Sequence, residues 1–170
     1  MRSFELKIQD NEFSKYSENY KYQTDSILVD VVRFAKENHY LNKELFLKIC
    51  KWKTPRSQPL CASNSEAFIK EITNIALTTN SDQLRIEILT ILKGVSWPTA
   101  SAILHFCHNE AFPILDFRAL YTLGFNKVPR YNYAFWEDYT NYCRKLGKQF
   151  NTDLRDVDRA LWQYSKENQN

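Results

Sequence analysis

One stretch of this chain, Ile91–Gly124, constrains the fold more than any other, because it combines tight turns with helical periodicity. Gly94 can take the positive φ that a sharp turn between two helices needs. Pro98 suits the first turn of a helix, where its missing N–H costs nothing. Asp116 stands at the N-terminus of a further short helix, 117–123, which Gly124 ends. The sequence therefore predicts a helical hairpin, then a loop, then a capped helix.

The composition of the rest of the chain also favours helices. Only three glycines and five prolines interrupt 170 residues, and apolar side chains recur at helical spacing. The fold class is therefore expected to be all-α, a compact multi-helix domain of about eight or nine helices that contains a helix-hairpin-helix motif. The expected caps elsewhere are Asp25, Asn42, the Ser63–Glu66 pattern and Asn151–Asp153, and a further helix is expected to start at Asp82. The side chains expected to face the core include Ile27, Phe68 and Leu84.

The length of the chain fits a single domain, or one domain with a small accessory lobe. Residues 1–24 are polar and aromatic and form an N-terminal arm whose order the sequence leaves open. Residues 25–170 are expected to form one helical domain and a monomer. Within it, the hairpin occupies 82–108 and the loop that carries Asp116 occupies 109–124.

Charge and aromatic content permit nucleic-acid binding without requiring it. The net charge is only +3. The chain has four Trp, ten Tyr and eleven Phe residues. Most of these rings belong in a core, but such a surplus also suits stacking on bases.

The hairpin stretch follows a pattern of leucine, glycine, an apolar residue and a later Thr-Ala pair. The matching residues are Leu92, Gly94, Val95, Thr99 and Ala100. With Asp116 at a similar interval, the stretch resembles the helix-hairpin-helix DNA glycosylases, the superfamily of endonuclease III and the 3-methyladenine glycosylases. The resemblance covers about a fifth of the chain closely. Ser96 replaces the family's second glycine, and Pro98 stands where bifunctional members carry a Schiff-base lysine.

The resemblance implies that Asp116 is the catalytic group. A carboxylate beside C1′ of the sugar stabilises the oxocarbenium ion that forms as an N-glycosidic bond breaks. The alternative is that Asp116 only caps the helix that follows it, and the two roles are compatible. Because Pro98 offers no amine, the expected nucleophile is water, and the expected enzyme removes a base without cleaving the strand.

The same resemblance implies a DNA-binding hairpin. Backbone N–H groups at the turn would hold a phosphate, and neighbouring cations would add charge. The basic turn Lys51–Arg56 either contacts DNA or is a solvated connector with its tryptophan in the core. The residues expected to bind DNA are Lys93, Gly94, Val95, Ser96, Thr99, Arg118, Lys53 and Arg56.

A target base must leave the duplex before its glycosidic bond can be cut. Its pocket needs aromatic walls, for which the candidates are Trp52, Trp97, Tyr121 and Trp136. The sequence does not rank these four, and it does not identify the excised base.

No metal or cofactor is expected. The four cysteines have no C-x-x-C spacing, and His105, Cys107 and His108 lack an evident further ligand. His108 is instead expected to be a surface residue at a helix C-terminus. Without a signal peptide or a membrane-spanning run, the expected location is the cytoplasm, associated with the nucleoid in a prokaryote.

These observations together favour a DNA N-glycosylase that acts on a flipped, damaged or modified base. A non-catalytic helix-hairpin-helix module that only binds DNA is the main alternative. A scaffold or interaction domain that keeps this fold without its function is a third.

Overall fold

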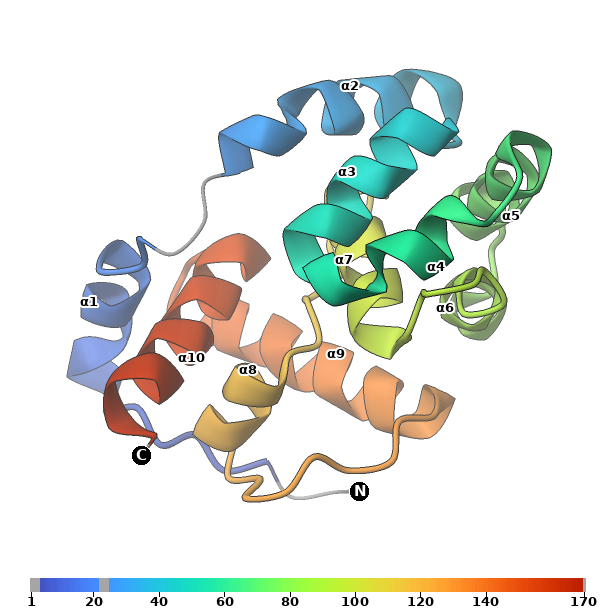
Figure 1. The fold of residues 1–170 in the computed structure, drawn as a ribbon. Helices are drawn as coiled ribbons and strands as arrows, with labels where there is room; N and C mark the ends of the chain where they lie inside the picture. Colours follow the sequence, from blue (N-terminus) through green and yellow to red (C-terminus); the bar gives the residue numbers. More distant parts are fainter. Residues whose placement is uncertain (1–3, 22–24, 170) are drawn as a thin grey trace. The chain divides into compact units, whose positions relative to one another are not determined.

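The computed structural model describes residues 4–21 and 25–169, and within these residues all regular structure is helical (Figure 1). The all-α expectation is confirmed. Ten α-helices are present in this part of the chain, close to the expected number. They divide into two compact units: Asp25–Phe112, here called the hairpin unit, and Met1–Thr24 with Pro113–Asn170, here called the aspartate unit. The range 25–170, treated above as one domain, therefore contains a boundary between Phe112 and Pro113.

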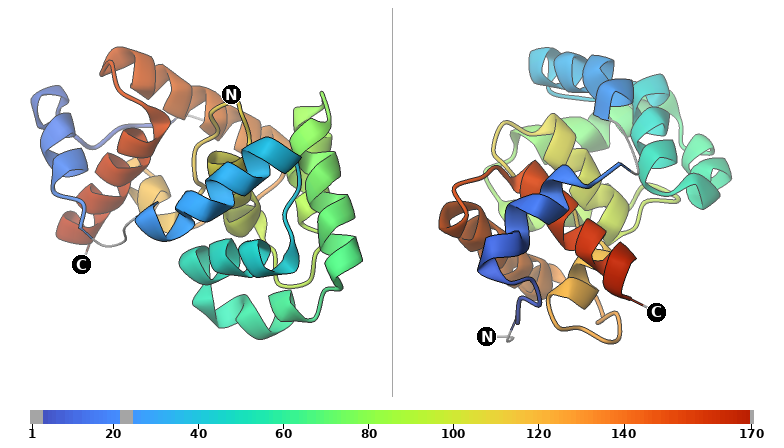
Figure 2. Two further views of the ribbon diagram at one scale, coloured as in Figure 1. Left: turned by 90° about the horizontal axis from the view of Figure 1, so that it is seen from above. Right: turned by 90° about the vertical axis from the view of Figure 1, so that its left-hand side faces the viewer.

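The hairpin unit is built around α7, which is buried almost all round. Its neighbours within the unit are α2, α3, α5 and α6 (Figures 1 and 2). A helix that is apolar on every side must be enclosed by others, which explains why the Thr99–Leu104 segment is fully buried. The elements of this unit are η2 (Asp25–Leu28), α2 (Val29–Asn38), α3 (Lys43–Lys53), η3 (Pro55–Ser57), α4 (Gln58–Ala62), α5 (Glu66–Thr78), α6 (Asp82–Leu89) and α7 (Trp97–Cys107).

The aspartate unit joins the described part of the N-terminal arm to the last third of the chain. Phe13 stacks on Phe150 with ring centroids 3.9 Å apart. The N–H groups of Glu5 and Lys7 donate to the carbonyls that end α8, at 3.1 and 2.9 Å. The arm is therefore part of this unit's core. Its elements are η1 (Asp10–Glu12), α1 (Phe13–Glu18), α8 (Phe117–Thr122), α9 (Tyr133–Gln149) and α10 (Leu154–Asn168).

Several expected caps are confirmed by hydrogen bonds. Asn42 accepts from the N–H of Leu45 at 2.9 Å, and Asp153 accepts from the N–H of Asp156 at 2.8 Å. Ser65 is the cap within the Ser63–Glu66 pattern. The cap expected at Asp25 is wrong, because residues 25–28 form a 3-10 turn and α2 begins only at Val29.

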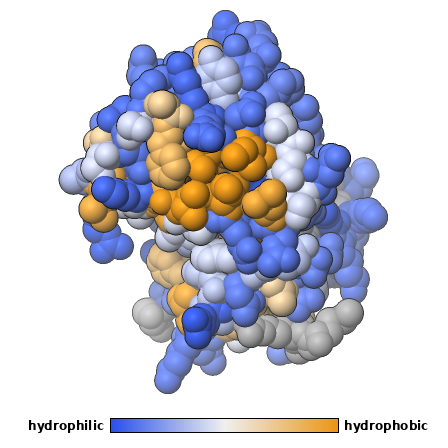
Figure 3. Space-filling view, turned by 90° about the vertical axis from the view of Figure 1, so that its right-hand side faces the viewer, coloured by the Kyte–Doolittle hydropathy of each residue, from blue (hydrophilic) through white to orange (hydrophobic). Residues whose placement is uncertain are grey.

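Three apolar side chains expected in the core are exposed instead. Ile27, Phe68 and Leu84 expose 58%, 38% and 42% of their surface. Periodicity assigned them to apolar helix faces, but neighbouring helices cover only part of each face. Figure 3 shows apolar side chains gathered on the side of the molecule where α5 and α6 lie.

Candidate functional site: hairpin and Asp116 loop

The turn between α6 and α7 depends on one left-handed residue. Gly94 has φ +82°, and the N–H of Val95 donates to the carbonyl of Leu92 at 3.1 Å. Ser96 has φ −100° and ψ 172°, which is ordinary extended backbone. Serine at the position of the family's second glycine is therefore accommodated without strain.

A single buried side chain, Asn64, fixes this turn from outside. Its Nδ2 donates to the carbonyl of Lys93 at 2.9 Å, and its Oδ1 accepts from the N–H of Lys93 at 3.0 Å. The same Nδ2 donates to the carbonyl of Cys61 at 2.9 Å. Asn64 therefore ties the hairpin to the end of α4. Sequence reasoning missed this role, because 29 positions separate the partners and Asn64 looked like part of a capping pattern.

Gly94 is also required by space. A Cβ at this position would lie 2.7 Å from Sγ and 2.8 Å from the backbone N of Cys61, and 3.0 Å from Cβ of Leu60. Real Cβ atoms do not approach backbone atoms so closely. Positive φ and close approach thus both select glycine at the turn.

Some backbone N–H groups of the hairpin turn are hydrogen-bonded within the protein, and others are not. Those of Lys93 and Val95 are bonded to Asn64 and to Leu92. Among the residues that the structure describes, the N–H groups of Gly94, Ser96 and Trp97 have no protein acceptor. These three groups precede or open α7, where the helix dipole favours an anion.

A basic turn adjoins the second hairpin helix. The hydroxyls of Thr54 and Thr99 lie 2.9 Å apart, which joins the Lys51–Arg56 turn to α7. Thr99 is fully buried, so its side chain supports the site from inside and does not reach a phosphate. Lys51, Arg56 and Lys93 are exposed, while Lys53 is half-buried. Three cations expected to bind DNA, Lys53, Arg56 and Lys93, therefore belong to the hairpin unit.

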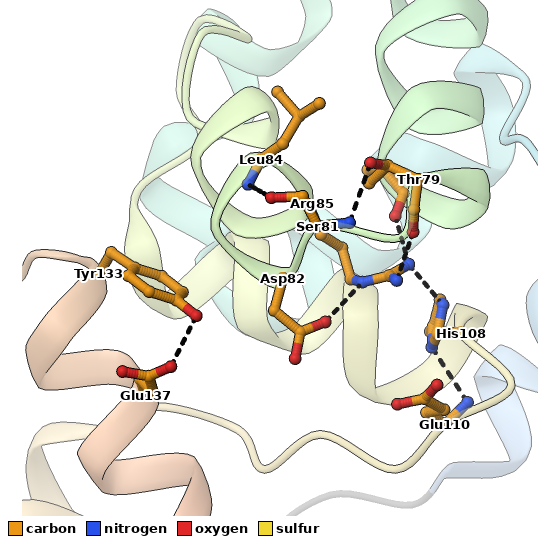
Figure 4. Close-up of polar contacts among 10 residues, drawn as sticks. Thr79, Ser81, Asp82, Leu84, Arg85, His108, Glu110, Tyr133 and Glu137 are labelled. Carbon is orange, nitrogen blue, oxygen red and sulfur yellow. Dashed lines mark hydrogen bonds and ion pairs between the residues drawn. The ribbon is translucent and has the colours of Figure 1, made fainter.

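A buried arginine fixes the two hairpin helices to each other (Figure 4). Arg85 on α6 donates to the Ala76 carbonyl at 2.9 Å and to Asp82 Oδ1 at 3.2 Å. Its guanidinium also contacts Nε2 of His108 at the end of α7, and the N–H of Glu110 donates to His108 Nδ1 at 3.0 Å. Burial, and then the charge of Arg85, lower the pKa of His108. His108 is therefore not the simple surface residue expected from sequence.

The cysteine and histidine residues form no evident metal centre. All four cysteines are buried thiols, and burial raises the pKa of Cys107. Nδ1–H of His105 donates to the Phe112 carbonyl at 2.7 Å. No group of three or more His, Cys, Asp or Glu side chains suited to a metal lies within residues 4–21 and 25–169.

In the aspartate unit, Asp116 caps α8 as the sequence predicted. Its Oδ1 accepts from the N–H of Arg118 at 2.9 Å, and its backbone is extended, with φ −144° and ψ 143°. Gly124, with φ +92°, follows the end of this helix. The capping bond fixes the carboxylate at the helix start.

Two buried side chains hold the loop just before Asp116. The carboxylate of Asp158, on α10, accepts from the N–H of Ile114 at 3.1 and 3.3 Å. The hydroxyl of Tyr139, on α9, donates to the carbonyl of Ile114 at 2.8 Å. Both donor and acceptor of one loop residue are thus satisfied from different helices. These contacts join residues far apart in sequence, so no local pattern predicts them.

Tyr131 is a second residue near Asp116 that sequence reasoning missed. Burial, and then the negative charge of Asp116, raise the pKa of Tyr131 to about 12. The Tyr131 hydroxyl is therefore protonated at neutral pH.

The four candidate walls of a base pocket have different surroundings. Trp52 is 8% exposed with its ring edge-on to Phe106, and Trp136 is 1% exposed. Lys7 Nζ lies 3.6 Å from the ring centre of Tyr121. Trp97, at the first position of α7, is half-buried. Of the three tryptophans in this set, Trp97 is therefore the most accessible.

Comparisons with models of protein families, with curated proteins and with solved structures found no match for this chain. In the part of the chain that the structure describes, no helix combines the length and the apolar composition needed to cross a membrane.

Proposed function

We propose that this chain is a DNA glycosylase that hydrolyses the N-glycosidic bond of a flipped, damaged or modified base. In this proposal the hairpin unit supplies phosphate contacts and the aspartate unit supplies the reacting carboxylate. Water attacks C1′ as the base departs, which leaves an intact abasic site.

The fixed position of Asp116 carries the proposal. A carboxylate stabilises a developing oxocarbenium ion only if it is held in place before the reaction. The capping bond to Arg118 and the anchors on Ile114 supply that rigidity.

The hairpin supports the DNA part of the proposal. Its turn offers three N–H groups, from Gly94, Ser96 and Trp97, that the described protein does not use. Exposed Lys93 and the cations of the Lys51–Arg56 turn lie in the same unit. Such groups fix the register of a protein on DNA without reading its sequence.

Strand cleavage is not part of the proposed activity. A glycosylase that also cleaves the strand needs an amine to form a Schiff base with C1′. Pro98 occupies the position of that amine, and the sequence contains no lysine from Gly94 to Leu115.

A DNA-binding module without catalysis is the second candidate. The capping bond of Asp116 favours it, because a structural role alone would account for an aspartate at the start of α8. The two candidates share the hairpin and differ only in whether Asp116 reacts.

The test is a panel of duplexes that each carry one oxidised, alkylated, deaminated or hypermodified base, scored for free base. The proposal expects release from at least one duplex, an intact strand, and no covalent adduct after borohydride reduction. Release from none of them, with DNA binding retained, would favour the binding module. A trapped adduct lost on changing one lysine, such as Lys51, Lys53 or Lys127, would show that a distant amine reacts.

A further inference from the structure

The aspartate unit carries a second set of groups suited to a nucleic acid, which starts at the helix that Asp116 caps and continues on two other elements. Helices α8 and α10 pack together, as do α1 and α10. Their contacts bring three aromatic rings and three cations together. We call this set the aromatic-cationic surface; its residues are Tyr20, Phe117, Arg118, Arg155, Trp162 and Lys166.

Rings and cations alternate across the first half of this surface. The guanidinium carbon of Arg118 lies 5.3 Å from the ring centre of Phe117 and 5.2 Å from that of Trp162. Nζ of Lys166 lies 5.5 Å from the ring centre of Trp162. These distances are within the range of a cation–π contact, so Arg118 bridges α8 and α10.

The second half extends the row towards the end of α1. Tyr20 meets Trp162 edge-on, with ring centroids 5.3 Å apart and planes at 79°. The guanidinium carbon of Arg155 lies 5.2 Å from the ring centre of Tyr20. Each ring of the surface therefore has a cation beside it.

Exposure separates this surface from the core. Phe117, the residue after Asp116, exposes 51% of its surface, and Lys166 is also exposed. The other four residues of the surface are half-buried. An isolated exposed phenylalanine is ordinary on a protein surface, but the Phe117 ring has the Arg118 guanidinium 5.3 Å from its centre. Cations attract phosphates, whereas a ring face suits any base, so the combination matches a polymer that presents both.

We infer that the aromatic-cationic surface binds single-stranded DNA, with unpaired bases stacked on its rings and phosphates near its cations. A duplex keeps its bases inside, so only unpaired nucleotides can use the rings. The inference rests on the proposed function for the identity of its ligand. It adds a surface for unpaired nucleotides that begins at Phe117, the residue after Asp116.

The test compares two fluorescent oligomers of equal length and charge, one of thymidines and one of abasic tetrahydrofuran units. Binding to the full chain is followed by fluorescence anisotropy at several salt concentrations. The thymidine oligomer should bind about fivefold or more tighter, because stacking requires bases. Equal affinities for the two oligomers would overturn the inference.

Two variants and two matched controls locate the effect. Phe117→Ala should remove most of the preference for thymidines, whereas Val128→Ala, at a residue that is 56% exposed in the same unit, should retain it. Lys166→Gln should weaken both oligomers and flatten the salt slope by about 0.7, whereas Lys148→Gln, also in the last turn of a helix, should leave the slope as in the wild type. Variants indistinguishable from their controls would contradict the assignment.

Base release is measured in parallel on the same preparations. Release from damaged duplexes without a preference for thymidines would leave the proposed function standing and remove this inference. A preference for thymidines without any base release would support the strand-binding surface and count against the glycosylase proposal.

Discussion

The hairpin turn and the Asp116 loop are both fixed by buried polar side chains, but they differ in how many supports they have. In the turn, Asn64 alone makes the bonds to both sides of Lys93. In the loop, Asp158 and Tyr139 hold Ile114 from two helices. The difference suggests that one substitution can release the turn, whereas the loop keeps one anchor when it loses the other.

Alanine substitutions at the two glycines, Gly94 and Gly124, should give the largest difference in stability between the two regions. Gly94→Ala adds a Cβ 2.7 Å from Cys61 Sγ, whereas Gly124→Ala meets its nearest atom, Glu5 Cβ, at 3.4 Å. Positive φ costs about 1–2 kcal/mol at either position, and the clash adds about 1–3 kcal/mol only at Gly94. Chemical denaturation should therefore show a clearly larger loss for Gly94→Ala. Equal losses of stability in the two variants would mean that the turn shifts to make room for the added Cβ.

Removing one anchoring side chain from each site should give the next largest difference. Asn64→Ala removes three hydrogen bonds and should lower the free energy of unfolding by about 2–3 kcal/mol and weaken DNA binding. Tyr139→Phe removes one bond, to Ile114, and should cost about 1 kcal/mol while DNA binding persists. Denaturation and anisotropy titrations measure both effects. Normal DNA affinity in Asn64→Ala would show that the turn binds DNA without the hydrogen bonds of Asn64.

Phosphate binding at the turn predicts a smaller, salt-dependent effect. Lys93→Ala should weaken binding to all DNA sequences alike and reduce the slope of affinity against salt by about 1. Lys36→Ala, in the last turn of α2 in the same unit, is the matched control and should leave the slope unchanged. Salt-independent binding by the wild type would remove both DNA-binding candidates.

The smallest expected effect concerns the Arg85–His108 contact that holds the hairpin helices. Because the pKa of His108 is lowered in the folded chain, unfolding takes up a proton once pH falls below the ordinary histidine value of 6.5. The contribution to stability is present above that value and is lost as pH falls through the folded pKa. Asp82 and Glu110 also face this contact and limit the shift. Unfolding measured against pH should be flatter in His108→Gln, and an unchanged slope would contradict this role.

Local chemistry explains which parts of the site the sequence could predict. Gly94 and Asp116 were found because a left-handed turn and a helix cap each need particular residues at a fixed local position. Asn64, Asp158 and Tyr139 were missed because their partners lie far away along the chain, and their types also suit ordinary helix positions.

The same limit explains the errors in burial. Phe68 and Leu84 lie on apolar stripes, yet they are exposed, because periodicity identifies a face without showing what covers it. Trp52 and Trp136 satisfied the aromatic requirement of a pocket, but both rings are buried.

The most direct test of the central claim compares base release by the wild type and Asp116→Asn on one reactive duplex, in single turnover with all DNA bound. Asparagine keeps the capping acceptor for Arg118 and removes the charge. We expect binding within about twofold of the wild type and base release slower by about a hundredfold or more. Release at the wild-type rate would show that Asp116 caps α8 and does not take part in catalysis.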